Sequence, residues 1–353
     1  MSGAVPGDPA RVGHLAAVTA DGNAYFRRVD ASDMDRVAVF GIGSTNFRSV
    51  AAAPDGEFLT DVAVERTRPC ELADQVLAAV EALERECGTV DAVAVATAGL
   101  VDADAGVVAA FDPPAGETIE AVDLGRPLAD RGLPLALEND ASAAALGEWY
   151  FGARADERCL AHVTIGTGIG GGVVTNGRLH RGAHGQAGEF GLIPVGPHDL
   201  ASTGVTGAWE AVASGRGIPE FFRYCLAESD AERALDPDAQ SGHDPGDGDL
   251  TAADVFDAAP DDPVAAECLE RVARYDAAGV GAVCNVVDPD LVTLGGGVVS
   301  AHPEWTIAGV ERHLEEFCFV DEPDVRTTAL GDHAGLYGAL ATYRARRDSL
   351  AAE

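Results

Sequence analysis

The chain has 353 residues, 47% of them hydrophobic, and its 58 Asp and Glu against 24 Lys and Arg give a formal net charge of −34. This length and apolar content suffice for a substantial core and favour two domains over one. The charge argues against nucleic acid and against an anionic membrane as partners, because binding to phosphates requires clustered cations.

All of the positive charge is arginine, since the sequence contains no lysine. Such a net charge repels itself in dilute buffer, whereas at about 1 M salt the Debye length falls to roughly 3 Å and most of the repulsion is screened. We therefore expect a protein of a salt-accumulating organism. The alternative, a merely acidic mesophilic protein, is less favoured because the sequence contains no lysine. No segment approaches the roughly 18 uncharged apolar residues of a membrane span, and no signal-peptide pattern is present, so we expect a cytoplasmic location.

The first half of the chain predicts an N-terminal extension followed by an α/β domain. Residues 1–35 are polar and weakly periodic, with a hairpin signal across Asp21-Gly22. Continuous apolar runs predict buried strands, and apolar residues spaced three and four apart predict an amphipathic helix. In chain order we expect strands at 37–40 and 46–50, a helix at 72–87 and a strand at 90–96.

The second half repeats this order of elements. Residues 228–250 are rich in Asp, Gly and Pro and lack an apolar period, which predicts an acidic surface insertion. The repetition predicts two related α/β domains across a cleft, the first at 36–137 plus 335–353 and the second at 138–334. Within the second half of the chain we expect strands at 160–165 and from 172, a helical region at 251–287, a strand at 291–294 and a helix at 334–345.

Two turns are rich in glycine and hydroxyl groups. Gly43-Ser44-Thr45 follows the first strand, and small residues there let the backbone and two hydroxyls approach an anion. The sequence Gly166-Thr167-Gly168-Ile169-Gly170-Gly171-Gly172 follows a second strand, and so many glycines carry a large entropic cost on folding. We interpret both as cradles for a triphosphate; ordinary or bulged hairpins are the alternative.

Three further features carry polar chemistry. Asn139-Asp140 precedes an Ala-rich helix, where it is either a plain helix cap or the source of a base, Asp140, for a hydroxyl nucleophile. Glu189 and Glu210 could accept hydrogen bonds from vicinal sugar hydroxyls, although a chain with 58 acids has many solvated carboxylates. Gly295-Gly296-Gly297 would let adenine and ribose lie against the backbone, or it is simply a strand-to-helix turn.

Taken together, these residues resemble the ROK family of sugar kinases and sugar-responsive regulators, within the actin-like and hexokinase-like ATPase superfamily. The resemblance extends from Arg36 to Arg344. It implies an α/β fold of two ribonuclease-H-like (actin/hexokinase-type) domains flanking a central cleft, and a glucokinase-like protein of haloarchaeal type. The segments similar to family motifs are 139–148, 166–172, 188–191, 288–297 and 335–339.

The resemblance also implies a reaction, ATP + hexose → ADP + hexose 6-phosphate, with Mg²⁺ and with glucose as the leading substrate. Asp140 would be the catalytic base, and a homodimer would be the assembly. Residues implied at the sugar are Asn139, Asp140, Glu189 and Glu210. Residues implied at the nucleotide are Gly43, Ser44, Thr45, Gly166, Thr167 and Gly168 for phosphates, with Gly295, Gly296 and Gly297 at the adenosine.

The sequence departs from the family pattern in three places. The family's first acid falls on Gly41, and its zinc-binding His falls on Leu192, with no Cys in residues 197–207, so we expect no structural zinc. No DNA-binding domain precedes residue 36, which argues against the repressor branch. Two alternatives stay open: a non-catalytic sugar- or nucleotide-binding regulator, and a kinase acting on fructose, mannose or N-acetylmannosamine. Retention of Asp140 favours a kinase.

Overall fold

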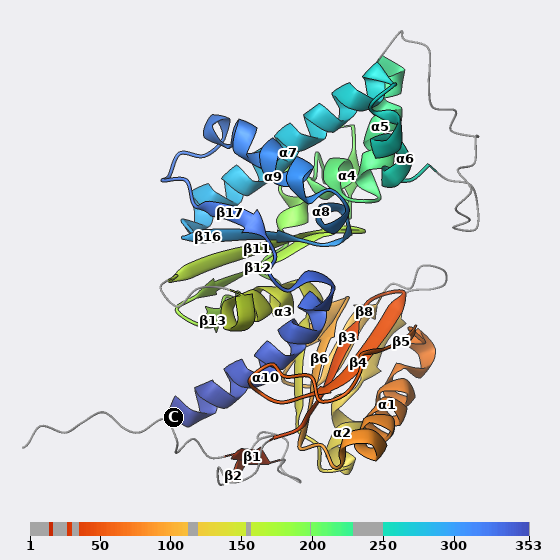
Figure 1. The fold of residues 1–353 in the computed structure, drawn as a ribbon, viewed down its shortest axis with the longest axis vertical. Helices are drawn as coiled ribbons and strands as arrows, with labels where there is room; N and C mark the ends of the chain where they lie inside the picture. The colour runs from red at the N-terminus through yellow and green to blue at the C-terminus, as the bar shows by residue number, and fades with distance from the viewer. Residues whose placement is uncertain are drawn as a thin grey trace, which may run out of the picture. The chain divides into compact units, whose positions relative to one another are not determined.

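A computed structural model describes the chain as two compact units, residues 1–152 with 332–353 and residues 153–331 (Figure 1). The expected turn at Asp21-Gly22 and nearly all of the expected acidic insertion lie outside the described residues. Within the N-terminal segment, β1 (His14–Ala16) pairs with β2 (Arg27–Val29) in antiparallel fashion. The described residues are 14–16, 27–29, 35–111, 119–152, 157–197, 199–228 and 250–352.

The first unit is built on a five-stranded sheet of order β10-β6-β3-β4-β5. β3 runs antiparallel to β4 and parallel to β6, and β6 runs parallel to β10. The central strands are nearly continuous apolar runs because both faces of the sheet are covered. The strand bounds are β3 Val37–Ile42, β4 Asn46–Ala52, β5 Ala63–Arg66, β6 Ala92–Thr97 and β10 Leu135–Asn139.

Alternate residues of β3 face two separate cores. Phe40 packs with the apolar face of α1 (Leu72–Cys87), and Val39 packs with α10 (Ala334–Ala352) on the other side of the sheet (Figure 1). The predicted helix at 72–87 therefore forms with the predicted bounds. Smaller elements complete the unit: β7 Leu100–Asp102, β8 Val107–Phe111, β9 Ile119–Asp123 and α2 Gly125–Asp130.

The boundary between the units falls after Gly152, later than the expected boundary after Leu137. The intervening helix α3 (Asp140–Gly147) belongs to the first unit because it packs closely on α10. At the contact, a Cβ added to Gly338 would lie 2.6 Å from the backbone carbonyl carbon of Ala143. Gly338 thus allows α10 to pack closely against the backbone of α3.

The second unit has a sheet of order β13-β12-β11-β16-β17 with the same sequence of pairings. β11 forms an antiparallel hairpin with β12, β12 pairs antiparallel with β13, and β16 and β17 add in parallel. The repetition that the sequence predicts is therefore present in the topology. The bounds are β11 Cys159–Ile165, β12 Ile169–Thr175, β13 Arg178–Leu179, β16 Leu291–Gly295 and β17 Asp324–Thr327.

The expected helical region at 251–287 is two helices. Thr251 starts the first with a capping box, and Asp262 caps the second at the backbone amides of Val264 and Ala265. Pro263 occupies the first turn of the second helix, where its missing N–H is harmless and the preceding residue is held extended. The helix bounds of this unit are α4 Glu210–Ala213, α5 Gly217–Glu228, α6 Ala252–Ala258, α7 Pro263–Val287, α8 Gly297–Ala301 and α9 Pro303–His313.

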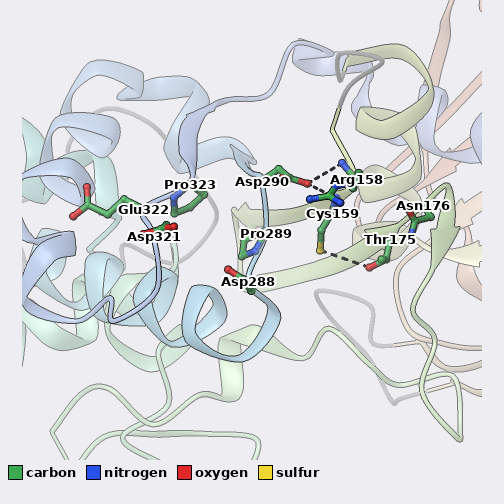
Figure 2. A pocket seen from close by; sticks show the side chains of 10 residues that line it. All are labelled: Arg158, Cys159, Thr175, Asn176, Asp288, Pro289, Asp290, Asp321, Glu322 and Pro323. Carbon is green, nitrogen blue, oxygen red and sulfur yellow. Dashed lines mark hydrogen bonds between the residues drawn. The ribbon is translucent and has the colours of Figure 1, made fainter.

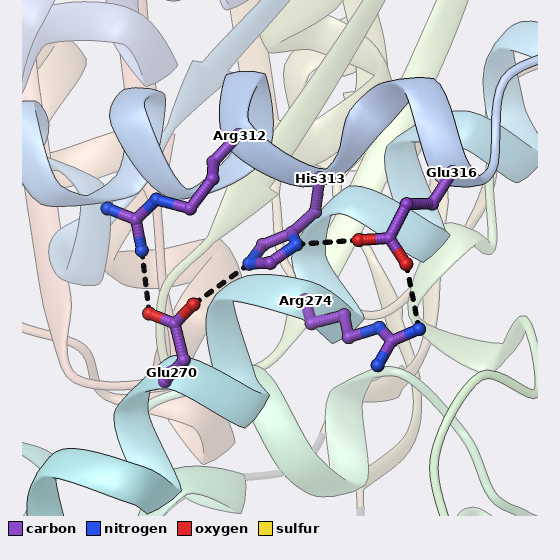
Figure 3. A network of polar contacts seen from close by, with 5 residues as sticks. All are labelled: Glu270, Arg274, Arg312, His313 and Glu316. Carbon is purple, nitrogen blue, oxygen red and sulfur yellow. Dashed lines mark hydrogen bonds and ion pairs between the residues drawn. The ribbon is translucent and has the colours of Figure 1, made fainter.

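A surface network of charges ties α9 to α7 (Figure 3). Arg312 donates to Glu270 at 2.7 Å, and the His313 ring bridges Glu270 at 3.0 Å and Glu316 at 2.9 Å. Arg274 donates to Glu316 at 2.8 Å. The hydrogen bond with Glu316, ahead of that with Glu270, raises the pKa of His313, so these carboxylates favour its charged form. In the part of the chain that the structure describes, no helix is long and apolar enough to cross a membrane.

Candidate active site

In the first unit, the turn between β3 and β4 consists of Gly43, Ser44 and Thr45. The Gly43 amide donates to the Asn46 carbonyl at 2.9 Å, and the Thr67 hydroxyl donates to the Gly43 carbonyl at 2.7 Å. The Ser44 side chain is half-buried and that of Thr45 is exposed. A Cβ added to Gly43 would meet only the Asn46 carbonyl oxygen, at 3.6 Å, so packing does not require this glycine.

Asn139 is the N-cap of α3. Its Oδ1 accepts from the amides of Ala141 at 3.0 Å and Ser142 at 3.2 Å, while its Nδ2 donates to the Gly99 carbonyl at 3.2 Å. The plain-cap interpretation therefore applies to Asn139 itself. The cap fixes where the next residue, Asp140, leaves the backbone.

Asp140 is exposed at the first position of α3, and its Oδ1 accepts from the Ala141 amide at 2.9 Å. Surrounding protein atoms raise the pKa of the Asp140 carboxyl above its usual value, and the backbone hydrogen bonds oppose this only in part. The Asp140 residue is thus exposed, although nearby protein atoms still disfavour the charged form of its carboxyl. A raised pKa makes a carboxylate a better acceptor for a hydroxyl proton at neutral pH.

Strand β3 offers no carboxylate beside this turn. Gly41 pairs with Arg48 on β4, so the Arg48 side chain lies on the same sheet face. A Cβ added to Gly41 would find its nearest atoms at 3.7 Å, so a side chain would fit there. Mg²⁺ takes oxygen ligands and a guanidinium has none to give, so this strand pair does not fit a metal held by the protein.

In the second unit, the turn between β11 and β12 is only Gly166, Thr167 and Gly168. Strand β12 begins at Ile169, not at Gly172 as expected, so the later glycines belong to the strand. A Cβ added to Gly171 would overlap the Phe190 ring and would lie 2.6 Å from the His162 carbonyl oxygen. The run of glycines thus divides into a turn and a packing surface.

The turn after β16, formed by Gly295, Gly296 and Gly297, lies beside the β11–β12 turn. Gly296 has φ 93°, and a Cβ there would sit 2.5 Å from the Ile165 carbonyl oxygen. A Cβ on Gly166 would lie 3.5 Å from the Gly297 amide. Because β11 and β16 are parallel, both turns lie at the carboxyl edge of the sheet, where open α/β sheets bind ligands.

A buried histidine joins the strands beneath these turns. His162 on β11 forms hydrogen bonds with the Thr293 hydroxyl at 2.9 Å and the Thr164 hydroxyl at 3.1 Å. Burial lowers the pKa of His162 to about 4, so the ring is neutral at physiological pH. Sequence analysis did not single it out; its only signal is a histidine within an apolar strand.

Glu210, predicted at the sugar, holds the β11–β12 turn. Its Oε2 accepts from the Ile169 amide at 2.8 Å, and its Oε1 accepts from the Ser202 hydroxyl at 2.6 Å. A Cβ added to Gly168 would overlap the same Oε2. These hydrogen bonds fix Glu210 beside the β11–β12 turn of the second unit, and the sequence did not indicate them.

Glu189 is exposed at the start of a short 3-10 helix, Phe190–Leu192. The preceding Gly188 has φ 98°, and a Cβ there would overlap the Gly171 carbonyl oxygen of β12. This close backbone contact sets the start of the helix against β12. The structure thereby places Glu189 next to the strand that leaves the β11–β12 turn.

The loop before Glu210 is held by a hairpin. β14 (Ala201–Ser202) pairs with β15 (Val205–Thr206) across Thr203 and Gly204. Both turn residues have positive φ, 47° and 83°, as in the tight turns that suit the twist of two strands. Among the described residues, no group of three or more His, Cys, Asp or Glu is placed to bind a metal.

Trp209 anchors the same loop to α7. Its buried indole N–H donates to Asp276 Oδ1 at 2.8 Å, and a Cβ added to Gly279 would overlap the ring. Burial raises the pKa of Asp276 to about 7, against the opposing effect of the Trp209 hydrogen bond. Sequence analysis missed Asp276, whose signal is an acid within an apolar helix face.

A cavity of about 510 Å³ lies at the opposite end of β11 from the glycine turns (Figure 2). Asp290 closes part of it, accepting from the amides of Arg158 and Cys159, each at 2.8 Å. Carboxylates outnumber the single guanidinium, which disfavours a phosphate ligand. The lining residues are Arg158, Cys159, Thr175, Asn176, Asp288, Pro289, Asp290, Asp321, Glu322 and Pro323.

We predict that Gly171→Ala destabilises the protein by about 1–3 kcal/mol, because the new methyl group overpacks against Phe190. Chemical denaturation in constant high salt measures this change. Gly297→Ala is the matched control, since its Cβ meets nothing within 4 Å. Equal stability of Gly171→Ala and the parent chain would show that Gly171 has no packing role.

We predict that the free energy of unfolding falls as the pH rises through about 7, through Asp276. Because its folded pKa is raised, its contribution is fully present below the unfolded pKa and is lost above the folded one. Melting temperatures measured between about pH 5 and pH 8.5 should decline less in Asp276→Asn than in the parent chain. An Asp276→Asn profile parallel to the parent's would contradict this pH dependence.

We also predict that Trp209→Phe lowers the free energy of unfolding by about 1–3 kcal/mol, because it leaves Asp276 without its hydrogen-bond donor.

Several proteins similar to this chain are sugar kinases. Residues 37–346 match the ROK family. The Glucokinase of Streptomyces coelicolor is 31% identical over 319 residues, 84% of this chain and 94% of that protein.

Two solved structures are similar over nearly their full length. A ROK hexokinase from Thermus thermophilus has a TM-score of 0.71 at 30% identity, covering 89% of this chain and 99% of that one. A ROK family glucokinase from Streptomyces griseus, in complex with glucose and AMPPNP, has a TM-score of 0.67 at 30% identity, covering 88% and 99%. The predicted actin/hexokinase-type fold class is thereby confirmed, and the chain belongs to the ROK family.

Proposed function

We propose that this protein is an ATP-dependent hexose kinase that transfers the γ-phosphate to the 6-hydroxyl of a hexose, with glucose as the leading substrate. The observation that carries the proposal is the pair of glycine turns side by side at the carboxyl edge of β11 and β16. The glucokinase names of the relative and of the solved structure with glucose and AMPPNP support the choice of substrates.

Asp140 is the proposed base. It takes the proton from the sugar 6-hydroxyl as the oxygen bonds to the γ-phosphorus and the bond to the ADP oxygen breaks. The raised pKa of Asp140 suits this transfer. We assign Asn139, Asp140, Glu189 and Glu210 to the sugar hydroxyls. Asn139 and Glu210 are already fixed by hydrogen bonds to their own units, so they meet a substrate with little loss of rotamer entropy.

The two hairpin turns, one in each unit, are the proposed phosphate ligands, and the turn after β16 is the proposed adenosine contact. Backbone amides and small hydroxyls bind phosphate without a lysine. The described residues beside these turns offer no carboxylate set for a metal, so in this proposal Mg²⁺ would be supplied together with ATP and would offset the phosphate charge. No step depends on a protein carboxylate at Gly41, where the facing residue is Arg48.

A non-catalytic, sugar-responsive role is the second candidate, and the pairing of Gly41 with Arg48 is the observation that favours it. A kinase acting on fructose, mannose or N-acetylmannosamine differs only in the sugar it accepts. For the assembly we propose a cytoplasmic homodimer with small-molecule substrates and without nucleic-acid or membrane partners. We do not include a structural zinc, because the β14–β15 hairpin and Trp209 hold the loop before Glu210.

We further propose that the protein is halophilic, on the grounds of its charge of −34 and its lack of lysine. Lowering KCl from about 3 M to about 0.1 M should unfold it, because the longer Debye length restores self-repulsion. Far-ultraviolet circular dichroism across a KCl series measures this. An unchanged spectrum and melting temperature at low salt would contradict the halophilic proposal.

We predict that Asp140→Asn lowers kcat by about 10²–10⁴-fold, because the amide cannot accept the proton. A coupled ADP-release assay in high KCl with Mg²⁺ measures turnover on glucose, fructose, mannose, glucosamine and N-acetylmannosamine. Glucose should give the highest kcat/KM, and the variant should keep its sugar-induced thermal shift.

Turnover that survives in Asp140→Asn would remove Asp140 as the base. A folded chain that binds sugar or nucleotide without turnover on any hexose would instead support the non-catalytic role. Gly41→Asp provides a further comparison, since the strand has room for its Cβ.

A further inference from the structure

An arginine that the sequence analysis passed over is fixed against the β11–β12 turn. The Gly215 amide donates to the Gly166 carbonyl at 2.7 Å. The next residue, Arg216, uses both its backbone amide and its side-chain Nε to donate to the Thr167 carbonyl, each at 3.3 Å. Two consecutive residues before α5, Gly215 and Arg216, therefore donate hydrogen bonds to two consecutive residues of the turn, Gly166 and Thr167.

The glycines on either side of Arg216 make this approach feasible. A Cβ added to Gly215 would lie 3.0 Å from the Gly166 carbonyl oxygen, and one added to Gly217 would overlap the Glu210 carbonyl oxygen. The buried Ser214 hydroxyl donates to that Glu210 carbonyl at 2.8 Å and accepts from the Gly217 amide at 2.9 Å. A loop packed this closely holds the Arg216 backbone in one place.

A guanidinium without an ion-pair partner among the described residues lies beside the β11–β12 turn. Acids outnumber cations by 58 to 24, and some arginines, such as Arg223 at 2.6 Å from Glu220, form ion pairs. Arg216 is exposed, and no described carboxylate lies within ion-pair distance of it. Its Nη2 lies 3.8 Å from where a Gly168 Cβ would be. Glu210 Oε2 overlaps the same Cβ position, so the Glu210 carboxylate lies near the guanidinium without forming an ion pair with it. The terminal donors of Arg216 thus lie beside the turn and form no ion pair with a described carboxylate.

We propose that Arg216 binds a phosphate group of the nucleotide, with Nε on the Thr167 carbonyl and its terminal nitrogens on phosphate oxygens. This inference rests on the proposed function, since it names a further ligand for the same ATP. Guanidinium groups bind phosphate through paired, charge-assisted hydrogen bonds, and a cation without an acidic partner loses no existing pair in doing so. A hexose hydroxyl would gain far less from this charge.

The alternative is a purely structural role, called bracing here, in which Arg216 only holds the Thr167 carbonyl in position through hydrogen bonds. Bracing requires the Nε–H and the backbone amide, whereas phosphate binding requires the charge. A variant that keeps a long polar side chain but loses the charge separates the two roles. Arg216→Gln is that variant, Arg216→Lys restores the charge without the fork, and Arg223→Gln on the exposed side of α5 is the matched control.

Direct ATP binding by calorimetry in high KCl, together with KM values for ATP and glucose, tests the proposal. Arg216→Gln should raise the Kd and KM for ATP about tenfold, the loss of about one charge-assisted hydrogen bond, and leave the glucose KM within about twofold. Arg216→Lys should recover part of the loss. Arg223→Gln should match the parent chain in all three quantities.

An unchanged ATP Kd in Arg216→Gln overturns the proposal. A rise in both KM values with a lower melting temperature also overturns it, in favour of bracing alone. Failure of the proposed function gives a different result, namely ATP binding without turnover on any sugar. In that case the effect of Arg216→Gln on the ATP Kd can still be measured and still tests the role of Arg216. A parent chain that does not bind ATP overturns both.

Discussion

The close approach of backbones at the carboxyl ends of β11 and β16 is the constraint on which the second unit depends. Ile165 ends one strand so near Gly296 that a Cβ on Gly296 would lie 2.5 Å from the Ile165 carbonyl oxygen, and a Cβ on Gly166 would lie 3.5 Å from the Gly297 amide. The neutral His162 ring joins the two strands through threonine hydroxyls directly beneath. Because side chains are absent from these glycines, main-chain atoms are exposed to a ligand's approach at this edge, and main-chain amides can bind a polyanion where lysine is absent.

That constraint also explains how an acidic chain can handle an acidic substrate. Glu210 lies beside the β11–β12 turn, but its oxygens are taken by the Ile169 amide and the Ser202 hydroxyl, so its charge is partly neutralised by donors. Arg216 Nη2 lies 3.8 Å from the same Gly168 Cβ position that Glu210 Oε2 overlaps, and it contributes positive charge there. Bulk charge therefore says little about local potential, which is set within a few ångströms and, in concentrated salt, is screened beyond that distance.

Much of the architecture could be predicted from the sequence, because long apolar runs and a clear helical period leave few alternatives. The ROK family, the repeated sheet and the helix at 72–87 are confirmed. The start of β12 was wrong, since glycine carries no strand signal and only contact with Phe190 reveals its purpose. The roles of Asp276 and Arg216 depend on partners 67 and 49 residues away, which no local pattern encodes.

Asn139 and Asp140 show why adjacent polar residues at a helix start resist interpretation from sequence. Both are good caps, and a cap needs only one of them. Asn139 takes the task, using its oxygen on two amides and its nitrogen on the Gly99 carbonyl. Asp140 is then left exposed, with a hydrogen bond from the Ala141 amide and a raised pKa. Asn139 thus provides the cap, and the neighbouring Asp140 carboxylate is not needed for capping and remains available for the role of base that we propose.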